Sequence, residues 1–269
     1  MIAILMATYN GEKYLREQID SLIAQTYQNW KLYIHDDGSV DSTLEIISDY
    51  SLKYRNKIIV VQDNIKHRGP SQSFLWLLEQ IDAEYYMFCD QDDVWLPNKV
   101  EVSYKTLIKS PSNLPAISFS DLYITDAKLN IIANSMWRYR KMINLIGTKF
   151  LLCTPQVTGC TIIINKLGRD VALSYKDSIA MHDIIVALSI VANEGLYIPI
   201  FESLIYYRQH SNNVLGMKPF DASILSRFKT LKDVVSENVR YYRIVHQIAR
   251  VSLLKYLYLK ILCFVKVRA

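Results

Sequence analysis

Three carboxylates follow directly on a short apolar run in the stretch from Tyr85 to Trp95, which reads YYMFCDQDDVW. Asp90, Asp92 and Asp93 fall within four positions of one another. Like charges this close repel one another, and burial would raise their pKa values further. Hard divalent cations bind carboxylate oxygens. The spacing therefore predicts a site for a divalent cation.

Two further polar clusters stand at the ends of predicted strands. Thr8, Tyr9 and Asn10 close the apolar run 2–8, and Asp37 stands in the turn DDGS that follows a second strand. In an open α/β sheet, ligands bind beyond the carboxyl ends of the strands. We therefore expect these side chains to share one rim with the three carboxylates, where Asp37 could accept the N3–H of a uracil or thymine ring. Taken alone, DDGS also suits a plain turn with a helix cap.

Strand and helix patterns alternate through the first part of the chain. Ser42 and Glu45 predict a capping box at the start of one helix, and Pro97 suits the first turn of another. The alternation predicts an α/β fold with a mostly parallel sheet and helices on both faces. The predicted strands are 2–8, 31–38, 57–63 and 85–90, and the apolar residues at helical spacing are Leu15, Ile19, Leu22, Ile23, Phe74, Leu77, Leu78 and Ile81.

The rest of the chain is less regular. Apolar residues between Ile184 and Val191 recur at helical spacing and predict a helix that starts near His182 and Asp183. From about Phe220 the sequence reads as helical to its end. The predicted strands of this part are 116–126, 159–165, 196–200 and 203–210.

The bulk composition fits an ordinary α/β protein. A chain of 269 residues is long enough for one large domain with an appendage, or for two domains. The four cysteines show no CxxC spacing, so we expect buried reduced thiols rather than zinc ligands or disulfides. The N-terminus reads as a strand without a signal-peptide pattern, and no apolar run reaches the length of a membrane span. These features favour a cytoplasmic protein.

Basic charge collects at the C-terminal end of the sequence. Residues 218–269 hold 11 Lys and Arg against 3 Asp and Glu, whereas the whole chain has a net charge of +5. Such a segment favours peripheral contact with anionic lipid, and a packed helical lid over the main domain is the alternative. Lys255, Lys260 and Lys266 do not share one helical face, so we expect no clean amphipathic stripe. No nucleic-acid-binding motif accompanies the charge.

Two common nucleotide-binding signatures are absent from the sequence. No GxGxxG follows the first strand, which argues against a dinucleotide enzyme, and no GxxxxGK[ST] is present, which argues against a P-loop NTPase. A cation held by carboxylates is another way to neutralise a phosphate group.

Six motifs occur in an order that resembles glycosyltransferase family 2, most of all its bacterial rhamnosyltransferase-like members. They lie within about residues 1–216 and read ATYNGEKYLREQIDSLIAQTY, DDGSVDST, CDQDDVW, TGCTIIIN, MHD and YRQHSNNVLG. The resemblance implies the GT-A fold, with a Rossmann-like nucleotide-binding half at about 1–110 and an acceptor half at about 111–217. Residues 218–269 would then form a basic helical extension.

The resemblance also implies roles for individual residues. Asp37 is similar to the family's pyrimidine-reading carboxylate, and Asp90 to the one that faces the ribose. Asp92 would bind the divalent cation together with His210 of YRQH, and Asp183 of MHD stands where the family has its general base. The residues implied to bind the nucleotide-sugar are Thr8, Tyr9, Asn10, Glu12, Asp37, Gly69, Asp90 and Gln91.

The activity implied by the resemblance is inverting, metal-dependent transfer of a sugar from dTDP-rhamnose or a UDP-sugar. The acceptor would be a hydroxyl of a glycan or of a lipid-linked glycan in cell-surface polysaccharide biosynthesis, and Mn²⁺ or Mg²⁺ the cation. The processive motif QxxRW is missing, which favours transfer of one sugar at a time. The chain departs from the common family pattern at His182, where Glu is usual, and at Ser73, where Asn is common.

Two other readings of these motifs are open. The string MFCDQDDV fits the hydrophobic-DxDxV signature of haloacid-dehalogenase phosphatases, with Asp90 as nucleophile. About ninety residues precede it, however, whereas that family needs this motif early in the domain. A non-catalytic nucleotide-sugar-binding module would share the N-terminal motifs but would need neither Asp183 nor His210. Asp183 alone would also suit a helix cap.

Overall fold

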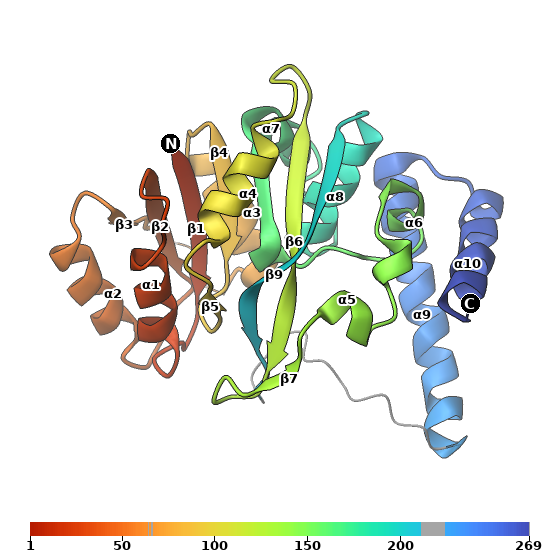
Figure 1. The fold of residues 1–269 in the computed structure, drawn as a ribbon, viewed down its shortest axis with the longest axis horizontal. Coiled ribbons are helices and arrows are strands. Elements are labelled where there is room, and N and C mark those ends of the chain that lie inside the picture. Colours follow the sequence, from red (N-terminus) through yellow and green to blue (C-terminus); the bar gives the residue numbers. More distant parts are fainter. Residues whose placement is uncertain (64, 66, 211–223, 269) are drawn as a thin grey trace.

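A mixed β-sheet runs through the molecule, with helices packed on both of its faces (Figure 1). The computed structural model describes residues 1–63, 65, 67–210 and 224–268. The first elements are β1 (Ile2–Thr8), α1 (Leu15–Ile23), β2 (Trp30–Asp36), α2 (Thr43–Lys53), β3 (Ile58–Val60), α3 (Pro70–Gln80) and β4 (Tyr85–Cys89). The next are β5 (Val94–Trp95), α4 (Lys99–Leu107), β6 (Ala116–Thr125), β7 (Ile131–Ala133), α5 (Met136–Tyr139), the 3₁₀ turn η1 (Ile143–Leu145) and α6 (Thr148–Leu151). The last are the 3₁₀ turn η2 (Gly159–Thr161), β8 (Ile162–Asn165), α7 (Lys166–Leu173), α8 (His182–Ala192), β9 (Leu196–Arg208), α9 (Ile224–Ala249) and α10 (Leu253–Arg268).

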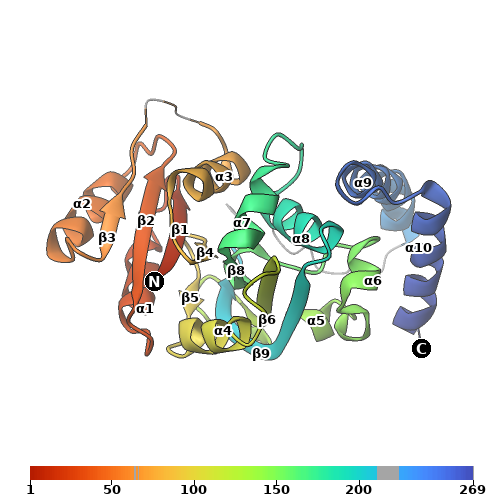
Figure 2. The ribbon, with the colours of Figure 1, turned by 90° about the horizontal axis from the view of Figure 1, so that it is seen from above.

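The sheet has the strand order β3-β2-β1-β4-β8-β6-β9-β5, and β7 pairs with β6 beside this path. Seen from above, α3, α7 and α8 lie on one face of the sheet, and α1 and α4 lie on the other (Figure 2). The predicted alternation of strands and helices is therefore confirmed for the first part of the chain.

The strand β1 lies between β2 and β4 and runs parallel to both. Residues 2–6 are fully buried, because helices cover both faces of the sheet here. The register pairs Thr8 with Asp36 and Met6 with Cys89, so the three strands end at the same rim. The polar clusters that follow these strands in the sequence are thereby brought together.

Beyond β4 the strand directions are mixed. β8 is antiparallel to both β4 and β6, whereas β9 runs parallel to β6. The sequence predicts two short strands between residues 196 and 210, but they form one strand, β9. Ser120 pairs with Ile200, whereas Asp121 pairs with Ser203. The register therefore shifts at a β-bulge, and the pairing of β6 with β9 continues beyond it.

Two helix starts differ from their predictions. Ser42 makes no capping hydrogen bond with its side chain. The Asp41 carboxylate accepts the Thr43 N–H instead, at 3.0 Å, because an oxygen one residue earlier reaches the first free donors of α2. Pro97 stands in the turn before α4 rather than in its first turn.

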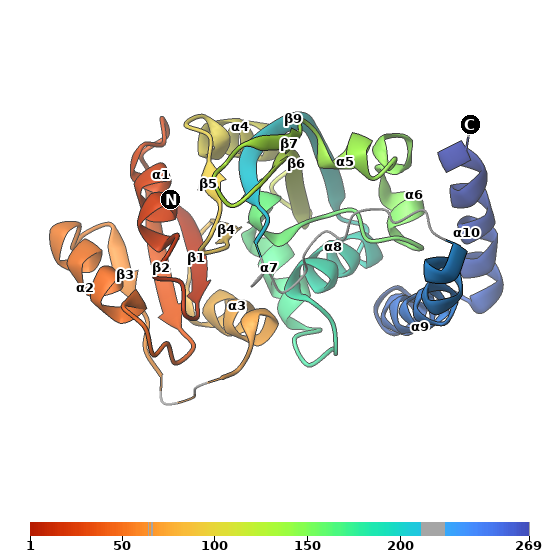
Figure 3. The same cartoon turned by 90° about the horizontal axis from the view of Figure 1, so that it is seen from below.

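Two helices, rather than one continuous helix, form the C-terminal end. Arg250 has a φ of 54°, in the left-handed region, which separates α9 from α10. α9 packs against α8, and the Tyr241 hydroxyl donates to the Leu151 carbonyl at 2.6 Å. α10 lies at the opposite end of the molecule from α2 (Figure 3). Within the described parts of the chain, no helix combines the length and the apolar character that crossing a membrane requires.

We expect Asn165→Ala to lower the free energy of unfolding by about 2–4 kcal/mol. The Asn165 Oδ1 accepts the backbone N–H groups of Gly168 at 2.8 Å and Ala116 at 2.9 Å, and its Nδ2 donates to the Leu114 carbonyl at 2.8 Å. These bonds join β8, α7 and the start of β6, and alanine would leave all three groups without a partner.

The comparison variant is Asn165→Asp, which keeps the accepting oxygen but replaces the amide donor with an oxygen that faces the Leu114 carbonyl. We expect it to cost less than the alanine variant, because the two accepted hydrogen bonds remain. Urea denaturation of both variants beside the parent measures the difference, and a loss in Asn165→Asp as large as that in Asn165→Ala would show that the contact with Leu114, rather than the two accepted hydrogen bonds, dominates the contribution of this side chain.

Candidate active site

A cavity of about 470 Å³ opens at the rim where β1, β2 and β4 end. The first turns of α3 and α8 and the η2 turn form its other walls. His210 lies beside it, in contact with Asp92, whereas Asn10 and Glu12 are not among its lining residues. The predicted residues that line the cavity are Thr8, Tyr9, Asp37, Gly69, Asp90, Gln91, Asp92 and Asp183.

A pair of amide hydrogen bonds fastens the loop after β4 to the end of β1. The Tyr9 N–H donates to Gln91 Oε1, and Gln91 Nε2 donates to the Tyr9 carbonyl, both at 2.9 Å. Gly11 leaves the space that this pairing needs, because a Cβ there would lie 2.4 Å from Gln91 Oε1. Gln91 thus positions the carboxylates on either side of it, Asp90 and Asp92.

Asn10 and Glu12 contact the neighbouring loop rather than the cavity. Asn10 has a left-handed φ of 48°, and its side-chain Oδ1 accepts the Val40 N–H at 2.9 Å. Glu12 Oε2 accepts the Ser42 N–H, also at 2.9 Å. Both residues hold the segment that follows β2, so this geometry makes them positioning residues for the loop that carries Asp37.

The two aspartates of the DDGS turn make different contacts. Asp36 serves the turn itself, because its carboxylate accepts both the N–H and the hydroxyl of Ser39, at 2.8 and 2.6 Å. Asp37 is buried in the cavity wall, and its two oxygens accept the N–H groups of Arg68 and Gly69, each at 2.8 Å. Each carboxylate oxygen can accept a second hydrogen bond. Asp37 can therefore still accept an N–H from a ligand.

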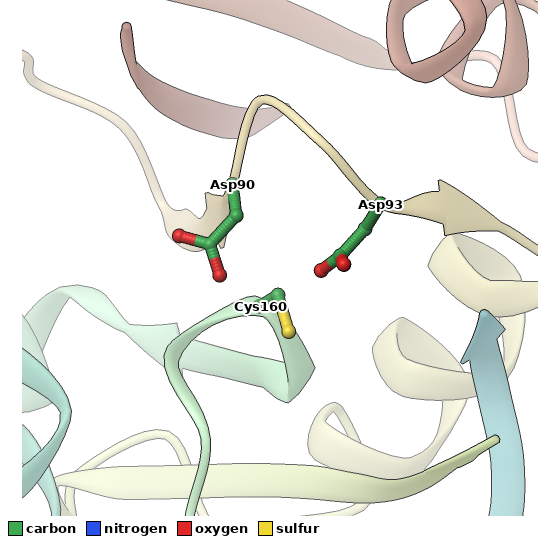
Figure 4. Close-up of side chains that lie close together, drawn as sticks. All are labelled: Asp90, Asp93 and Cys160. Atoms are coloured by element: carbon green, nitrogen blue, oxygen red, sulfur yellow. The ribbon is translucent and has the colours of Figure 1, made fainter. Parts of the chain in front are cut away.

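Asp90, Asp93 and Cys160 point toward one another next to the cavity, with one ligand atom of each within 4.8 Å of the others (Figure 4). Desolvation, with the charges of Asp92 and Asp183, raises the pKa of Asp90 to about 7. Desolvation and the neighbouring aspartates raise the pKa of Asp93 well above its usual range, and burial does the same for the pKa of the Cys160 thiol. A protonated thiol is a poor ligand for Mn²⁺ or Mg²⁺. This cluster is therefore less suited to a hard cation than an oxygen and imidazole pair.

Asp92 and His210 form such a pair. His210 Nε2 lies 2.9 Å from Asp92 Oδ2. This is the distance of a direct hydrogen bond between the two side chains. The Arg208 guanidinium donates to the Asp92 carbonyl at 2.8 Å, and the Tyr14 ring packs on His210 with 4.8 Å between ring centroids. The two side chains are thus held in place, and they bring together a carboxylate oxygen and an imidazole nitrogen, both of which can bind a divalent cation.

Asp183 faces the same cavity from the first turn of α8. It is the second residue of that helix, and the cap position belongs to Met181. Its Oδ1 accepts the N–H of Ile184 at 2.7 Å. Desolvation by the surrounding protein raises the pKa of Asp183 to about 6. A carboxylate whose pKa lies near neutrality suits a general base.

Comparison with known proteins identifies the family. A model of the family described as glycosyl transferase family 2 matches residues 3–164. The chain belongs to glycosyl transferase family 2. The prediction of a glycosyltransferase is therefore confirmed, and the phosphatase reading of MFCDQDDV is wrong.

Curated relatives of this family 2 glycosyltransferase include bacterial transferases. The chain is 28% identical over 242 residues to the dTDP-rhamnosyl transferase RfbG of Shigella flexneri, which covers 84% of this chain and 78% of that protein. It is 32% identical to an uncharacterized glycosyltransferase of Rickettsia prowazekii, across 61% of this chain and half of the relative's length.

Solved structures confirm the GT-A fold for this family 2 chain. S. aureus TarS in complex with UDP-GlcNAc superposes with a TM-score of 0.60 at 16% identity, covering 99% of this chain and 81% of that one. The mannosyltransferase PcManGT from Pyrobaculum calidifontis, in complex with GDP-Man and Mn²⁺, also gives 0.60, at 14% identity over 98% of this chain and 74% of that one.

Sequence reasoning missed two buried polar side chains in the cavity wall of the transferase. His182 packs between the rings of Phe74 and Phe88, and desolvation lowers its pKa to about 3, so it is neutral. Neither His182 nor the Ser73 hydroxyl has a hydrogen-bond partner among the described residues. Gly159 makes room for the imidazole, because a Cβ there would lie 2.5 Å from its Nε2. The only sign of these two residues in the sequence is that it departs from the family pattern at His182 and Ser73.

We expect Gly11→Ala and Gln91→Ala to weaken binding of a nucleoside diphosphate by the same mechanism, each roughly three- to tenfold. The first substitution displaces the Gln91 amide from Tyr9, and the second removes that amide. The double variant should therefore bind no more weakly than the worse single variant, because neighbours that share one interaction are not additive. Isothermal titration calorimetry measures the nucleotide affinity of the parent, the two single variants and the double variant. Fully additive losses would show that Gly11 acts independently of the Tyr9–Gln91 pairing.

Proposed function

We propose that this enzyme transfers a single sugar, with inversion, from a pyrimidine nucleotide-sugar to an acceptor hydroxyl in a metal-dependent reaction. The observation that carries the proposal is that one cavity contains Asp37, Asp92 and Asp183, which suit nucleobase recognition, cation binding and proton abstraction respectively. The acceptor we propose is a glycan or lipid-linked glycan of cell-surface polysaccharide biosynthesis.

The donor assignment rests on Asp37 and on the relatives. A carboxylate with a free lone pair in the cavity wall can accept the N3–H of thymine or uracil, which are alike in this respect. RfbG is named a dTDP-rhamnosyl transferase, an Escherichia coli relative is named a UDP-Glc glucosyltransferase, and TarS was solved with UDP-GlcNAc. We therefore propose dTDP-rhamnose first and UDP-sugars second. Thr8, Tyr9, Gly69 and Gln91 would complete the donor wall, with Asp90 toward the ribose.

Asp92 and His210 would hold the divalent cation, Mn²⁺ or Mg²⁺, at the diphosphate. When bound, the cation stabilises the negative charge that develops on the departing nucleoside diphosphate. Asp92 supplies a carboxylate oxygen and His210 an imidazole nitrogen, both of which these ions accept. PcManGT was solved with Mn²⁺, which supports a cation in this fold.

Asp183 would accept the proton of the acceptor hydroxyl as that oxygen attacks the anomeric carbon. The bond between this carbon and the diphosphate oxygen breaks on the opposite face, so one displacement inverts the configuration. The raised pKa makes Asp183 a stronger base than an exposed carboxylate while leaving it ionised above about pH 6.

The other aspartates near the sheet suit the role of base less well. Asp121 is buried, and its carboxylate accepts the N–H groups of Leu122 and Met136 and the hydroxyl of Ser135. Those contacts make it the anchor of α5. Asp93 is also buried, desolvation and the neighbouring aspartates raise its pKa well above its usual range, and its Oδ1 already accepts the Arg208 N–H.

We further propose that the chain divides functionally into a nucleotide-binding half (about 1–110), an acceptor half (about 111–217) and a basic extension (218–269). The four cysteines are free thiols, and all but Cys263 are buried. Free thiols support a reaction in the reducing cytoplasm, at the inner face of the cytoplasmic membrane if the acceptor is lipid-linked.

We expect the parent protein to bind dTDP and UDP more tightly than GDP, with an affinity that Mn²⁺ increases. Asp92→Asn should lose most of the increase caused by Mn²⁺, because an amide is a weaker ligand than a carboxylate, whereas Asp170→Asn on the exposed side of α7 should keep it. Titration calorimetry with and without Mn²⁺ tests both points. Selective binding of GDP would overturn the donor assignment, and an unchanged Mn²⁺ effect in Asp92→Asn would overturn the cation assignment.

We expect the transfer rate of the parent to rise with pH up to about 6 and then to level off, because Asp183 must lose its proton before it can act as a base. Asp183→Asn should lower the rate by roughly 10²–10⁴ and remove this dependence while leaving donor affinity nearly unchanged. Asp177→Asn, an exposed change six residues earlier, is the control. The transfer rate of all three proteins is measured as a function of pH with dTDP-rhamnose and a soluble acceptor. Near-normal transfer by Asp183→Asn would show that the base is another group.

A further inference from the structure

The outward face of α10 is apolar from Leu254 to Val265. Leu254 is 81% exposed and Ile261 is 64% exposed, and Leu257, Tyr258 and Val265 are also largely exposed. Residues three, four and seven apart lie on one side of a helix, so these side chains form one continuous surface, which we call the α10 face. Exposed apolar surfaces of this kind mark contact sites for a partner or a membrane.

The opposite side of α10 attaches it to the rest of the protein. Tyr256 and Leu259 are buried, and the Tyr256 hydroxyl donates to the Asn238 carbonyl of α9 at 3.1 Å. Figures 1 and 3 place α10 at the outer end of the molecule, and no other described element lies beyond it. The α10 face is therefore directed away from the protein.

Lysines lie along both borders of the α10 face. Lys255 and Lys266 are about three turns apart and fall on one border, where Lys266 Nζ lies 5.3 Å from the centroid of the Phe150 ring. Lys260 falls on the other border and is half-buried. As the sequence predicts, the three lysines do not share one face of α10, and exposed apolar side chains extend too far round the helix to form a clean amphipathic stripe. Lys255 and Lys266 lie on one side of the α10 face and Lys260 lies on the other.

This arrangement points to an anionic lipid surface rather than to a second copy of the chain. Residues 218–269 hold 11 Lys and Arg against 3 Asp and Glu, so pairing two α10 faces would bring two strongly basic segments together. Anionic headgroups would instead attract the lysines at both borders. At 16 residues, α10 is shorter than the roughly 20 residues that span a bilayer. A helix too short to span the bilayer can instead lie in the plane of the interface, with its exposed apolar side chains in the bilayer surface.

We propose that α10 is a membrane-docking helix, whose apolar face enters the surface of a bilayer rich in anionic lipid while Lys255, Lys260 and Lys266 contact the headgroups. The proposal does not depend on the transferase reaction. Its test uses neither donor nor acceptor, so that its failure would leave the proposed activity untouched.

The experiment is flotation of the full chain with vesicles of phosphatidylglycerol and phosphatidylcholine, compared with vesicles of phosphatidylcholine alone. We expect binding to the mixed vesicles that weakens as salt is raised, because screening acts on exposed charges. Leu254→Ser with Ile261→Ser should weaken binding at least about tenfold, since it removes two buried aliphatic groups from the bound state. Lys255→Gln should weaken it by roughly fivefold.

The matched control is Leu44→Ser with Leu52→Ser on α2, which removes two exposed leucines at the other end of the molecule. The control should bind vesicles like the parent, and thermal unfolding should show that both double variants are folded. Failure of the parent to bind anionic vesicles would overturn the proposal, as would equal loss in the two double variants. Sedimentation of the parent as a dimer that Leu254→Ser with Ile261→Ser dissociates would assign the α10 face to a second copy instead.

Discussion

The active site depends on one physical constraint, which is the burial of several carboxylates next to one another. Asp90, Asp93 and Asp183 all have raised pKa values, in each case chiefly because the protein replaces the water around them. Such groups are costly to hold together, and the surrounding hydrogen bonds offset that cost. The Tyr9–Gln91 pairing holds the loop on one side, and the Arg208 N–H donates to Asp93 on the other. A bound cation would relieve the remaining repulsion.

The sheet explains why these groups meet at all. Parallel strands that end in register deliver the polar residues after β1, β2 and β4 to one rim, and the fully buried β1 fixes that register. The antiparallel β8 then brings the η2 turn, with Gly159 and Cys160, against the same loop. Asp183 lies in the first turn of α8, which packs on α7 and α9. The cavity is therefore assembled from segments that are far apart in the sequence.

The parts of this arrangement that local pattern controls could be predicted from the sequence. Apolar runs gave the strands of the first half, and the position of Asp37 and Asp92 after those strands placed them on one rim. Tertiary contacts decided the rest. The capping oxygen of α2 comes from Asp41 through a local hydrogen bond, but Glu12 turns toward the Ser42 N–H through a contact between segments 30 residues apart. Cys160 was expected only as a buried thiol, because its approach to Asp90 depends on strand pairing between β4 and β8.

The most direct test of the account is the number of protons released when the cation and nucleotide bind. Asp90, with a pKa of about 7, is partly protonated at pH 7. A divalent cation beside it should lower that pKa and expel the proton. Calorimetry of Mn²⁺–dTDP binding at pH 7, in buffers of different ionisation enthalpy, should show net proton release, and Asp90→Asn should lower that release by roughly half a proton. Binding without proton release by the parent would contradict the claim that cation binding relieves a strained, partly protonated carboxylate cluster.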